Sequence, residues 1–296
     1  MNKLRLLSNH LGKVYDVALS RRPAGRSMTV YPQDLFIVSY PRSGNTWTRF
    51  LVGNFLYQDA PVTFANVEAR IPSIYVFPDW KLRRLPRIFK SHDCFDPRYR
   101  RVIYIVRDPR DVAVSAYHYS IKVGILEEAC PIERFMPLFM SGNFGSGLLA
   151  DPRWGCWYDN VASWMAMGHN REFLLLRYED MLKDPRHELK TVAEFLNLEP
   201  SPERLERAVQ LSAADRMREL EKKEGTIWQL TKHTRQDKKF VRSGKVGNWQ
   251  DELPVDSVAQ LERAWGSLMQ RLGYHLTTAS SQGEREEPQL SHSKLR

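Results

Sequence analysis

The chain has 296 residues, of which 42% are hydrophobic and 27% are charged. This balance is that of a folded globular protein, and it excludes a collagen, a coiled coil and a disordered chain. Lysine and arginine number 44 against 35 aspartate and glutamate, so the net charge is +9, which is compatible with a solvated surface, an anionic ligand or a nucleic acid.

Residues 1–32 are predicted to form a peripheral N-terminal helix and loop. Apolar residues recur at helical spacing between Leu4 and Ala18, which favours a short amphipathic helix docked on the protein over one that contacts a membrane. Charges interrupt this stretch, so it does not resemble a signal peptide, and no run approaches the roughly 20 apolar residues of a membrane span. The three cysteines form no CxxC motif and cannot all pair, which favours a reducing compartment and a cytoplasmic protein.

Four short apolar runs have the composition of strands buried on both faces of a parallel sheet. They lie at residues 35–39, 87–90, 102–106 and 173–176. Helical patterns lie at residues 46–57, 111–121, 158–167, 185–196, 201–211 and 255–272. Because strands alternate with helices, we predict an α/β fold with three α/β/α layers around a central, mainly parallel sheet. We expect one domain over residues 33–276, a long mobile segment at 222–247 and a disordered tail at 277–296.

The first predicted strand runs into the loop YPRSGNTW at residues 40–47, and a helix follows. A strand, loop and helix start of this kind binds phosphate or sulfate through backbone N–H groups. Gly44 lets the backbone approach an anion, Ser43 and Thr46 add hydroxyl donors, and Arg42 adds a permanent charge. The loop lacks the Lys-Ser/Thr pair of GxxxxGK[ST], so it is P-loop-like only. The alternative is an ordinary helix start with Ser43 as its N-cap.

The third predicted strand, residues 102–106, ends at Arg107. Arg107 at a carboxyl edge faces the crevice in which open α/β sheets bind ligands. Asp108 is a predicted N-cap, and Ser115 lies about two turns into the helix that follows. Arg107 and Ser115 can therefore hold a second phosphate, whereas Arg110 is interpreted as a solvated residue.

The second predicted strand leads into Lys90-Ser91-His92. A histidine at the carboxyl end of a core strand is placed like a general base, because its pKa lies near the working pH. The alternative is a structural histidine, which is the commoner case for a histidine taken alone.

A basic, glycine-containing loop lies at residues 240–249. Its glycines let backbone N–H groups reach an anion, which Arg242 and Lys245 would neutralise. The alternative is a flexible, solvated loop.

Taken together and in their order along the chain, from about Asp34 to Gly273, these motifs resemble those of the cytosolic sulfotransferase family. The loop at 40–47 is similar to the one that binds the 5′-phosphosulfate of PAPS (3′-phosphoadenosine 5′-phosphosulfate). The segment from Arg107 to Ser115 is similar to the 3′-phosphate motif, and the loop at 242–244 to the one that closes on that phosphate.

The resemblance implies transfer of a sulfuryl group from PAPS to a hydroxyl, or an amine, of a small-molecule acceptor, with PAP (3′-phosphoadenosine 5′-phosphate) as the product. His92 would be the general base, and Arg42 and Lys90 would stabilise the leaving phosphate. No metal is expected, since a sulfuryl group carries less charge than a γ-phosphoryl group. The positions that match the family's donor site are Arg42, Ser43, Gly44, Asn45, Thr46, Trp47, Arg107, Ser115, Tyr178, Ser212, Arg242, Ser243 and Gly244.

Several positions depart from the family pattern. Arg42 stands where the family has lysine, and an arginine cannot donate a proton to the leaving group. Asn45 replaces a common threonine, and Ser243 replaces a lysine. Ala214 removes a phenylalanine that stacks on the adenine, and residues 250–259 do not match the family's dimer signature, so a homodimer of that form is not assumed.

Two other classes of protein remain open. A kinase or NTPase with a variant phosphate loop is the alternative, although it needs a GK[ST] sequence and a Walker B acid that are not evident. A nucleic-acid-binding module would use the positive charge, but no known motif is present and we expect no nucleic acid partner. The acceptor is expected to contact loops at residues 64–80, 122–154 and 222–240, whose aromatic side chains include Tyr75 and Trp154.

Overall fold

The computed structural model describes residues 23–143 and 152–277. Within them, four parallel strands form a sheet in the order β2-β1-β3-β4. The strands are β1 (Leu35–Ser39), β2 (Ile88–Ser91), β3 (Arg101–Val106) and β4 (Phe173–Arg177). The predicted α/β fold with a parallel sheet is confirmed. The predicted N-terminal helix and nearly all of the predicted tail lie outside the described residues.

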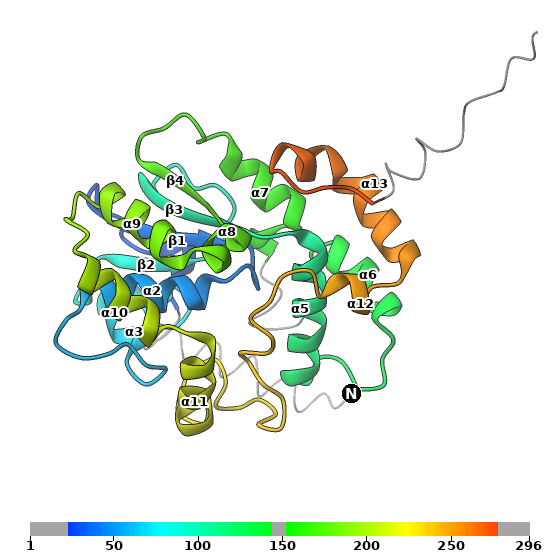
Figure 1. Ribbon diagram of the computed structural model, residues 1–296, viewed down its shortest axis with the longest axis horizontal. Coiled ribbons are helices and arrows are strands. Elements are labelled where there is room, and N and C mark those ends of the chain that lie inside the picture. The colour runs from blue at the N-terminus through cyan, green and yellow to red at the C-terminus, as the bar shows by residue number, and fades with distance from the viewer. Residues whose placement is uncertain (1–22, 144–151, 278–296) are drawn as a thin grey trace, which may run out of the picture.

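Helices cover both faces of the sheet, which gives the three predicted layers (Figure 1). Successive side chains of a strand point to opposite faces. Phe36 and Val38 therefore join the core on one face, while Leu35 and Ile37 join the core on the other. The first face packs against α5 (Pro109–Lys122), α6 (Ile132–Met140), α7 (Trp157–Met165) and α13 (Val255–Arg271). The second packs against α2 (Asn45–Leu56), α8 (Tyr178–Lys183), α9 (Pro185–Phe195) and α10 (Pro202–Leu211).

The remaining elements are short, except for α11 (Ala214–Glu224), which the sequence analysis missed, as it missed α6. The short ones are η1 (Gly25–Ser27), α3 (Val67–Arg70), α4 (Asp79–Leu82), η2 (Pro152–Trp154) and α12 (Trp249–Glu252). Helix α11 is rich in charged residues and has few apolar ones, among them the buried Met217 and Leu220. The segment at 222–247, predicted to be mobile, begins in α11 and is anchored by Trp228, whose ring lies 4.7 Å from that of Phe64.

Strand β4 differs from its prediction as a strand buried on both faces. It is the edge strand of the sheet next to β3, and Leu175 is 37% exposed. Position in the sheet, which composition does not encode, therefore leaves one side of an apolar strand uncovered.

Two predictions concern the start of α5: the one for Asp108 is confirmed, and the one for Arg110 is wrong. Asp108 is the N-cap and accepts a hydrogen bond from the backbone N–H of Arg110, as expected. Arg110 is not solvated: it is 3% exposed and forms ion pairs with Asp108 and with Glu262 of α13. Its second partner lies far along the chain, where local sequence gives no indication of it.

No helix in residues 23–143 and 152–277 combines the length and the apolar character needed to cross a membrane.

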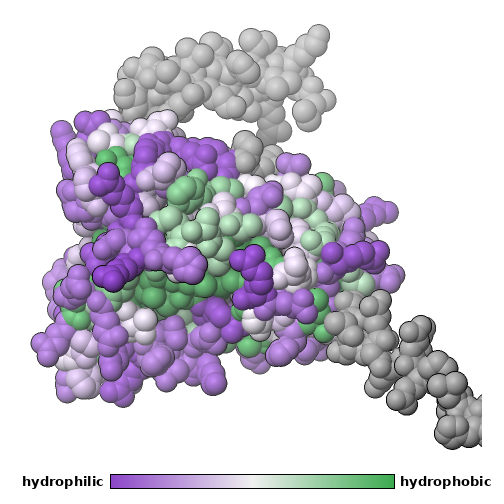
Figure 2. All heavy atoms as spheres, turned by 90° about the horizontal axis from the view of Figure 1, so that it is seen from above, coloured by the Kyte–Doolittle hydropathy of each residue, from purple (hydrophilic) through white to green (hydrophobic). Residues whose placement is uncertain are grey.

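On the face shown in Figure 2, hydrophobic side chains gather in the middle and hydrophilic side chains surround them. Because β1, β2 and β3 are parallel, the residues that follow them meet at one edge of the sheet, where the candidate site lies.

Candidate active site

A cavity of about 360 Å³ lies at the carboxyl edge of the sheet. Every predicted site residue except Ser43 lines it. Those lining residues are Arg42, Gly44, Asn45, Thr46, Trp47, Lys90, His92, Arg107, Ser115, Tyr178, Ser212, Arg242, Ser243 and Gly244. The fold thus brings side chains from six separate stretches of the sequence to one space.

The phosphate loop connects β1 to α2 through Gly44, which is the N-cap of the helix in place of Ser43. Gly44 has a φ of 100°, and a Cβ there would lie 2.5 Å from Cδ2 of Tyr178. Only glycine therefore permits this turn and this approach to the tyrosine ring. The first N–H groups of α2 have no acceptor within the helix, so they are available to an anion in the cavity.

The polar groups of two residues of this loop are buried or bonded within the protein. Ser43 is buried, and its Oγ has no hydrogen-bond partner among the described residues. Asn45 donates from Nδ2 to the carbonyl of Ile37 (3.1 Å) and to Oγ of Ser39 (3.3 Å), so its amide braces the loop against β1. Their predicted hydrogen bonds to a donor molecule stay predictions.

Arg42 lies across the cavity between two aromatic rings. Its Nε donates to Oγ of Ser115 (3.1 Å), and its guanidinium lies 4.4 Å from the ring centre of Tyr119 and 4.7 Å from that of Phe240. Burial lowers the pKa of Arg42 to about 10, so the side chain stays charged at neutral pH. The sequence analysis missed Tyr119; its place one helical turn after Ser115 was the available signal.

Arg107 joins three parts of the site. Its guanidinium donates to the carbonyl oxygens of Lys245 (3.1 Å) and Arg42 (3.4 Å) and lies 4.3 Å from the ring centre of Tyr178. Asp111, one turn further along α5, accepts hydrogen bonds from the N–H groups of Gly247 (2.8 Å) and Trp249 (3.2 Å). Asp111 of α5 also lies 3.7 Å from the guanidinium of Arg107, so it links this arginine to the basic loop.

The basic loop at 242–247 packs against α11. Arg218 of α11 donates to the carbonyl of Ser243 (2.9 Å), and a Cβ on Gly244 would lie 3.3 Å from that of Ala214. Arg242 pairs with Glu252 at 2.6 Å. We call Arg42, Arg107, Ser115, Arg242 and Gly244 the arginine end of the cavity.

Two aromatic rings, from Trp47 and Tyr178, lie between the phosphate loop and α10. Their centroids are 5.6 Å apart at 73°, and Nε1 of Trp47 donates to the carbonyl of Ser212 (3.0 Å). Ser212 is itself held through its hydroxyl by Asn54 (3.1 Å). This corner offers flat apolar surfaces on which a planar ring, such as that of a nucleotide base, can stack. Ala214 adds no aromatic side chain to it.

His92 stands just beyond the end of β2 and is 8% exposed. Its Nδ1 lies 2.7 Å from the carbonyl oxygen of Ser39, which can only accept, so Nδ1 carries the proton and Nε2 is the basic nitrogen. Among the described residues, Nε2 has no hydrogen-bond partner. Burial and the charge of Lys90 lower the pKa of His92 well below its ordinary value, so the ring is neutral at neutral pH.

Lys90 lies two residues before His92 and is 5% exposed. Burial and the neighbouring charge of Arg49 lower the pKa of Lys90 to about 7. No residue in the described ranges accepts a hydrogen bond from Nζ, so the ammonium is free to meet an anion. We call Ser73, Tyr75, Lys90, His92 and Trp154, all of which line the cavity, the histidine end.

The cationic groups and hydrogen-bond donors of the cavity suit an anion that bears two charged groups. Three guanidinium groups, the start of α2 with its free N–H groups, and Lys90 all line this one cavity. In the part of the chain that the structure describes, no three His, Cys, Asp or Glu side chains come together as metal ligands would.

Known proteins match this chain over most of its length. The family model described as "Sulfotransferase domain" matches residues 32–273. The 3-beta-hydroxysteroid sulfotransferase of Cavia porcellus is 27% identical over 252 residues, covering 81% of this chain and 85% of that protein. The amine sulfotransferase of Oryctolagus cuniculus is 24% identical over 254 residues, covering 80% of each. The crystal structure of mouse sulfotransferase SULT7A1 complexed with PAP shares the fold, with a TM-score of 0.68 at 22% identity, covering 88% of this chain and 92% of that one.

Proposed function

The chain belongs to the sulfotransferase family, and from that premise we propose that it transfers a sulfuryl group from PAPS to a small-molecule acceptor. The group that receives it is a hydroxyl or an amine, and His92 is the general base. The observation that carries the proposal is the pairing, in one cavity, of an arginine-rich anion site with a neutral histidine whose Nε2 is free. The mouse sulfotransferase that shares the fold was solved with PAP, which supports PAPS as the donor.

The reaction uses the histidine end. Nε2 of His92 takes the proton of the acceptor hydroxyl as the acceptor oxygen attacks sulfur. The new S–O bond forms while the bond from sulfur to the 5′-phosphate oxygen of the donor breaks, and PAP leaves with that electron pair. Lys90, Arg42 and the N–H groups of α2 stabilise the charge that grows on the departing oxygen. In this scheme Arg42 acts as a charge alone, because its guanidinium does not release a proton.

The arginine end binds the donor. Arg107, Ser115 and Arg242 hold the 3′-phosphate, with Ser243 and Gly244 closing over it. Trp47, Tyr178 and Ser212 surround the adenine ring of the donor, and Gly44, Asn45 and Thr46 form the turn beside its 5′-phosphate. Fixed cations and N–H dipoles suffice because a sulfuryl group carries less charge than a γ-phosphoryl group, so we propose a reaction without a metal ion.

The acceptor site is the histidine end and its aromatic walls. Tyr75 and Trp154 line the cavity beside His92, which suits a small molecule with an apolar body and one reacting hydroxyl. The names of the two relatives include a hydroxysteroid and an amine, so both kinds of acceptor group belong in a screen. The three cysteines are free thiols, which fits the cytoplasm as the place of action.

The proposal is tested with purified protein, radiolabelled PAPS and a panel of phenols, alcohols and amines. We expect labelled product from at least one acceptor. In parallel, thermal unfolding is followed with PAP, 5′-AMP or ATP·Mg. A ligand at a concentration 100 times its Kd adds about 2.7 kcal/mol, which for a chain of this size raises Tm by roughly 5 °C or more. A rise with PAP is expected; a rise with ATP·Mg alone would contradict the proposal and favour the kinase alternative.

A further inference from the structure

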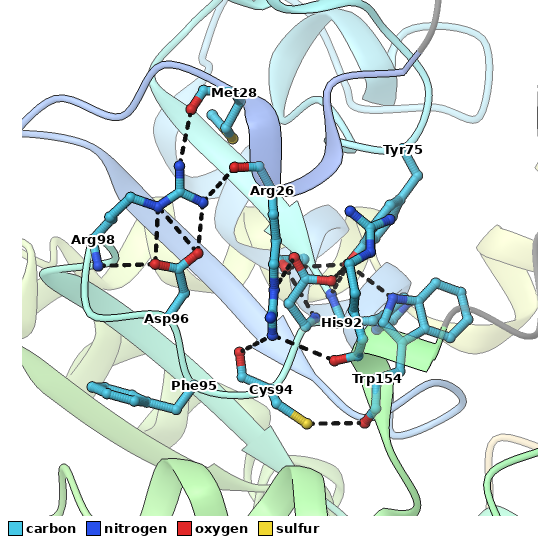
Figure 3. A network of polar contacts seen from close by, with 12 residues as sticks. Arg26, Met28, Tyr75, His92, Cys94, Phe95, Asp96, Arg98 and Trp154 are labelled. Carbon is cyan, nitrogen blue, oxygen red and sulfur yellow. Dashed lines mark hydrogen bonds and ion pairs between the residues drawn. The ribbon is translucent and has the colours of Figure 1, made fainter.

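The hydroxyl of Tyr75 is a meeting point for three groups around His92 (Figure 3). It accepts hydrogen bonds from the backbone N–H of His92 (2.9 Å) and from Nε1 of Trp154 (3.0 Å). It donates its own proton to Oδ1 of Asp93 (2.8 Å). A phenol offers one donor and two acceptor lone pairs, so these three bonds use the hydroxyl fully. Oγ of Ser91 lies further from it, at 3.3 Å.

The backbone places Tyr75 beside His92. The segment before Tyr75 runs along β2: the N–H of Lys90 donates to the carbonyl of Pro72 (2.9 Å), and the N–H of Ile74 donates to the carbonyl of Lys90 (3.2 Å). The rings of Tyr75 and His92 are nearly parallel, at 9° with centroids 6.2 Å apart. Pairing with β2 therefore brings the tyrosine to the level of the histidine.

Trp154 stands edge-on to both rings. Its centroid is 5.3 Å from that of His92 at 72° and 5.4 Å from that of Tyr75 at 69°. Because Trp154 also lines the cavity, one hydroxyl connects the base to a wall of the acceptor site.

The acceptor of the tyrosine proton is itself fixed. Asp93 is fully buried, and its Oδ2 lies 3.5 Å from Nε of Arg26 in η1. The carbonyl of Asp93 accepts a hydrogen bond from Nε1 of Trp164 (2.9 Å), and the carbonyl of His92 accepts one from Nδ2 of Asn160 (2.9 Å). The His92 backbone is thus held at its carbonyl by α7 and at its N–H by Tyr75.

We propose that Tyr75 is a positioning residue for the reaction, which holds His92 and Trp154 in one arrangement so that Nε2 meets the acceptor group. This inference rests on the proposed role of His92. Removing the hydroxyl would take away the acceptor that the backbone N–H of His92 and Nε1 of Trp154 share, and buried donors without an acceptor relax toward other contacts. The imidazole would then leave its alignment, on which the rate of proton transfer depends.

The test is Tyr75→Phe, with Tyr274→Phe as the matched control. Tyr274 is also buried, and its hydroxyl donates to Glu179 (3.1 Å), but it does not line the cavity. We expect Tyr75→Phe to lower kcat by about 10–100-fold, because a small misplacement of a catalytic group has costs of this order. The affinity for PAP stays that of the wild type, and Tyr274→Phe keeps the wild-type kcat. A wild-type kcat in Tyr75→Phe, or a parallel loss of kcat and of PAP affinity, would overturn the proposal.

A second readout does not depend on activity. In NMR spectra of the protein carrying isotope-labelled histidine, the His92 signal is identified by its absence from His92→Gln. We expect the wild type to show the neutral form protonated at Nδ1, and Tyr75→Phe to show a mixture of tautomers. If the wild type transfers no sulfuryl group but the tautomer changes, the proposed function fails and the positioning role stands. An unchanged His92 signal in Tyr75→Phe would overturn the positioning role, whatever the activity.

Discussion

The two ends of the cavity carry titratable groups of different kinds. At the arginine end, Arg42 and Arg107 are guanidinium groups held by hydrogen bonds and by aromatic rings. At the histidine end, Lys90 and His92 are buried, and burial lowers the pKa of each. Permanent charge suits binding, whereas a buried histidine that is neutral at neutral pH offers a nitrogen that can accept a proton. The difference between the two ends therefore separates donor binding from proton transfer.

The largest effect is expected at His92. We expect His92→Ala to lower the transfer rate by about 10²–10⁴-fold, the usual contribution of a general base, while PAP binds as it does to the wild type. Steady-state transfer and calorimetric titration with PAP measure the two quantities. Equal losses of both would mean that His92 supports the structure of the cavity rather than the reaction.

Arg107 tests the other end. A hydrogen bond to a charged group contributes about 1.5–3 kcal/mol, so Arg107→Ala should weaken PAP binding by roughly 10- to 150-fold. The affinity for 5′-AMP, which lacks the 3′-phosphate, should change little, so the preference for PAP is lost. The exposed Arg216 of α11, which does not line the cavity, provides a control, Arg216→Ala, that also removes one positive charge. A preference for PAP that survives in Arg107→Ala would show that the 3′-phosphate lies elsewhere.

Lys90 makes donor binding depend on pH. Its pKa of about 7 means that the ammonium is charged below that pH and neutral above it. PAP affinity should therefore fall as the pH rises through neutrality. In Lys90→Arg the guanidinium stays charged, so part of this dependence disappears. Comparing the two proteins over the same pH range cancels the ionisation of the phosphates themselves, and identical pH profiles would count against the role of Lys90.

The smallest effect distinguishes two hydroxyls of the phosphate loop. Thr46 lines the cavity, whereas Ser43 does not and has a buried Oγ. A neutral hydrogen bond contributes about 0.5–1.5 kcal/mol, so Thr46→Ala should weaken PAP binding a few-fold. Ser43→Ala should leave PAP binding unchanged. Calorimetry on both variants decides between them, and a larger loss in Ser43→Ala would restore the original interpretation of that serine.

Local patterns were enough to predict the sheet, and together with the family resemblance they predicted about half of the residues that line the cavity. Strand composition and the residues immediately after each strand identified Arg42, His92 and Arg107, because a parallel sheet brings such positions to one edge. The partners that hold these residues were not predictable. Ser115 bonds to Arg42 across 73 positions of sequence, and Asp111 holds Gly247 across 136.

The same reason explains the errors. Arg110 was interpreted as solvated because Glu262, its partner on α13, is 152 positions away. The hydroxyl of Tyr75 reaches His92 because of how residues 72–74 pair with β2, which composition does not reveal. Side-chain type and strand ends are local properties, whereas hydrogen-bond partners depend on packing.

The most direct test of the division between the two ends is a crystal structure of the protein with PAP. We predict that the 3′-phosphate contacts Arg107, Ser115 and Arg242, and that the 5′-phosphate lies against the first N–H groups of α2, on the side of Lys90 and His92. A nucleotide bound in the opposite direction, with its 3′-phosphate beside His92, would contradict the assignment of binding to one end and proton transfer to the other.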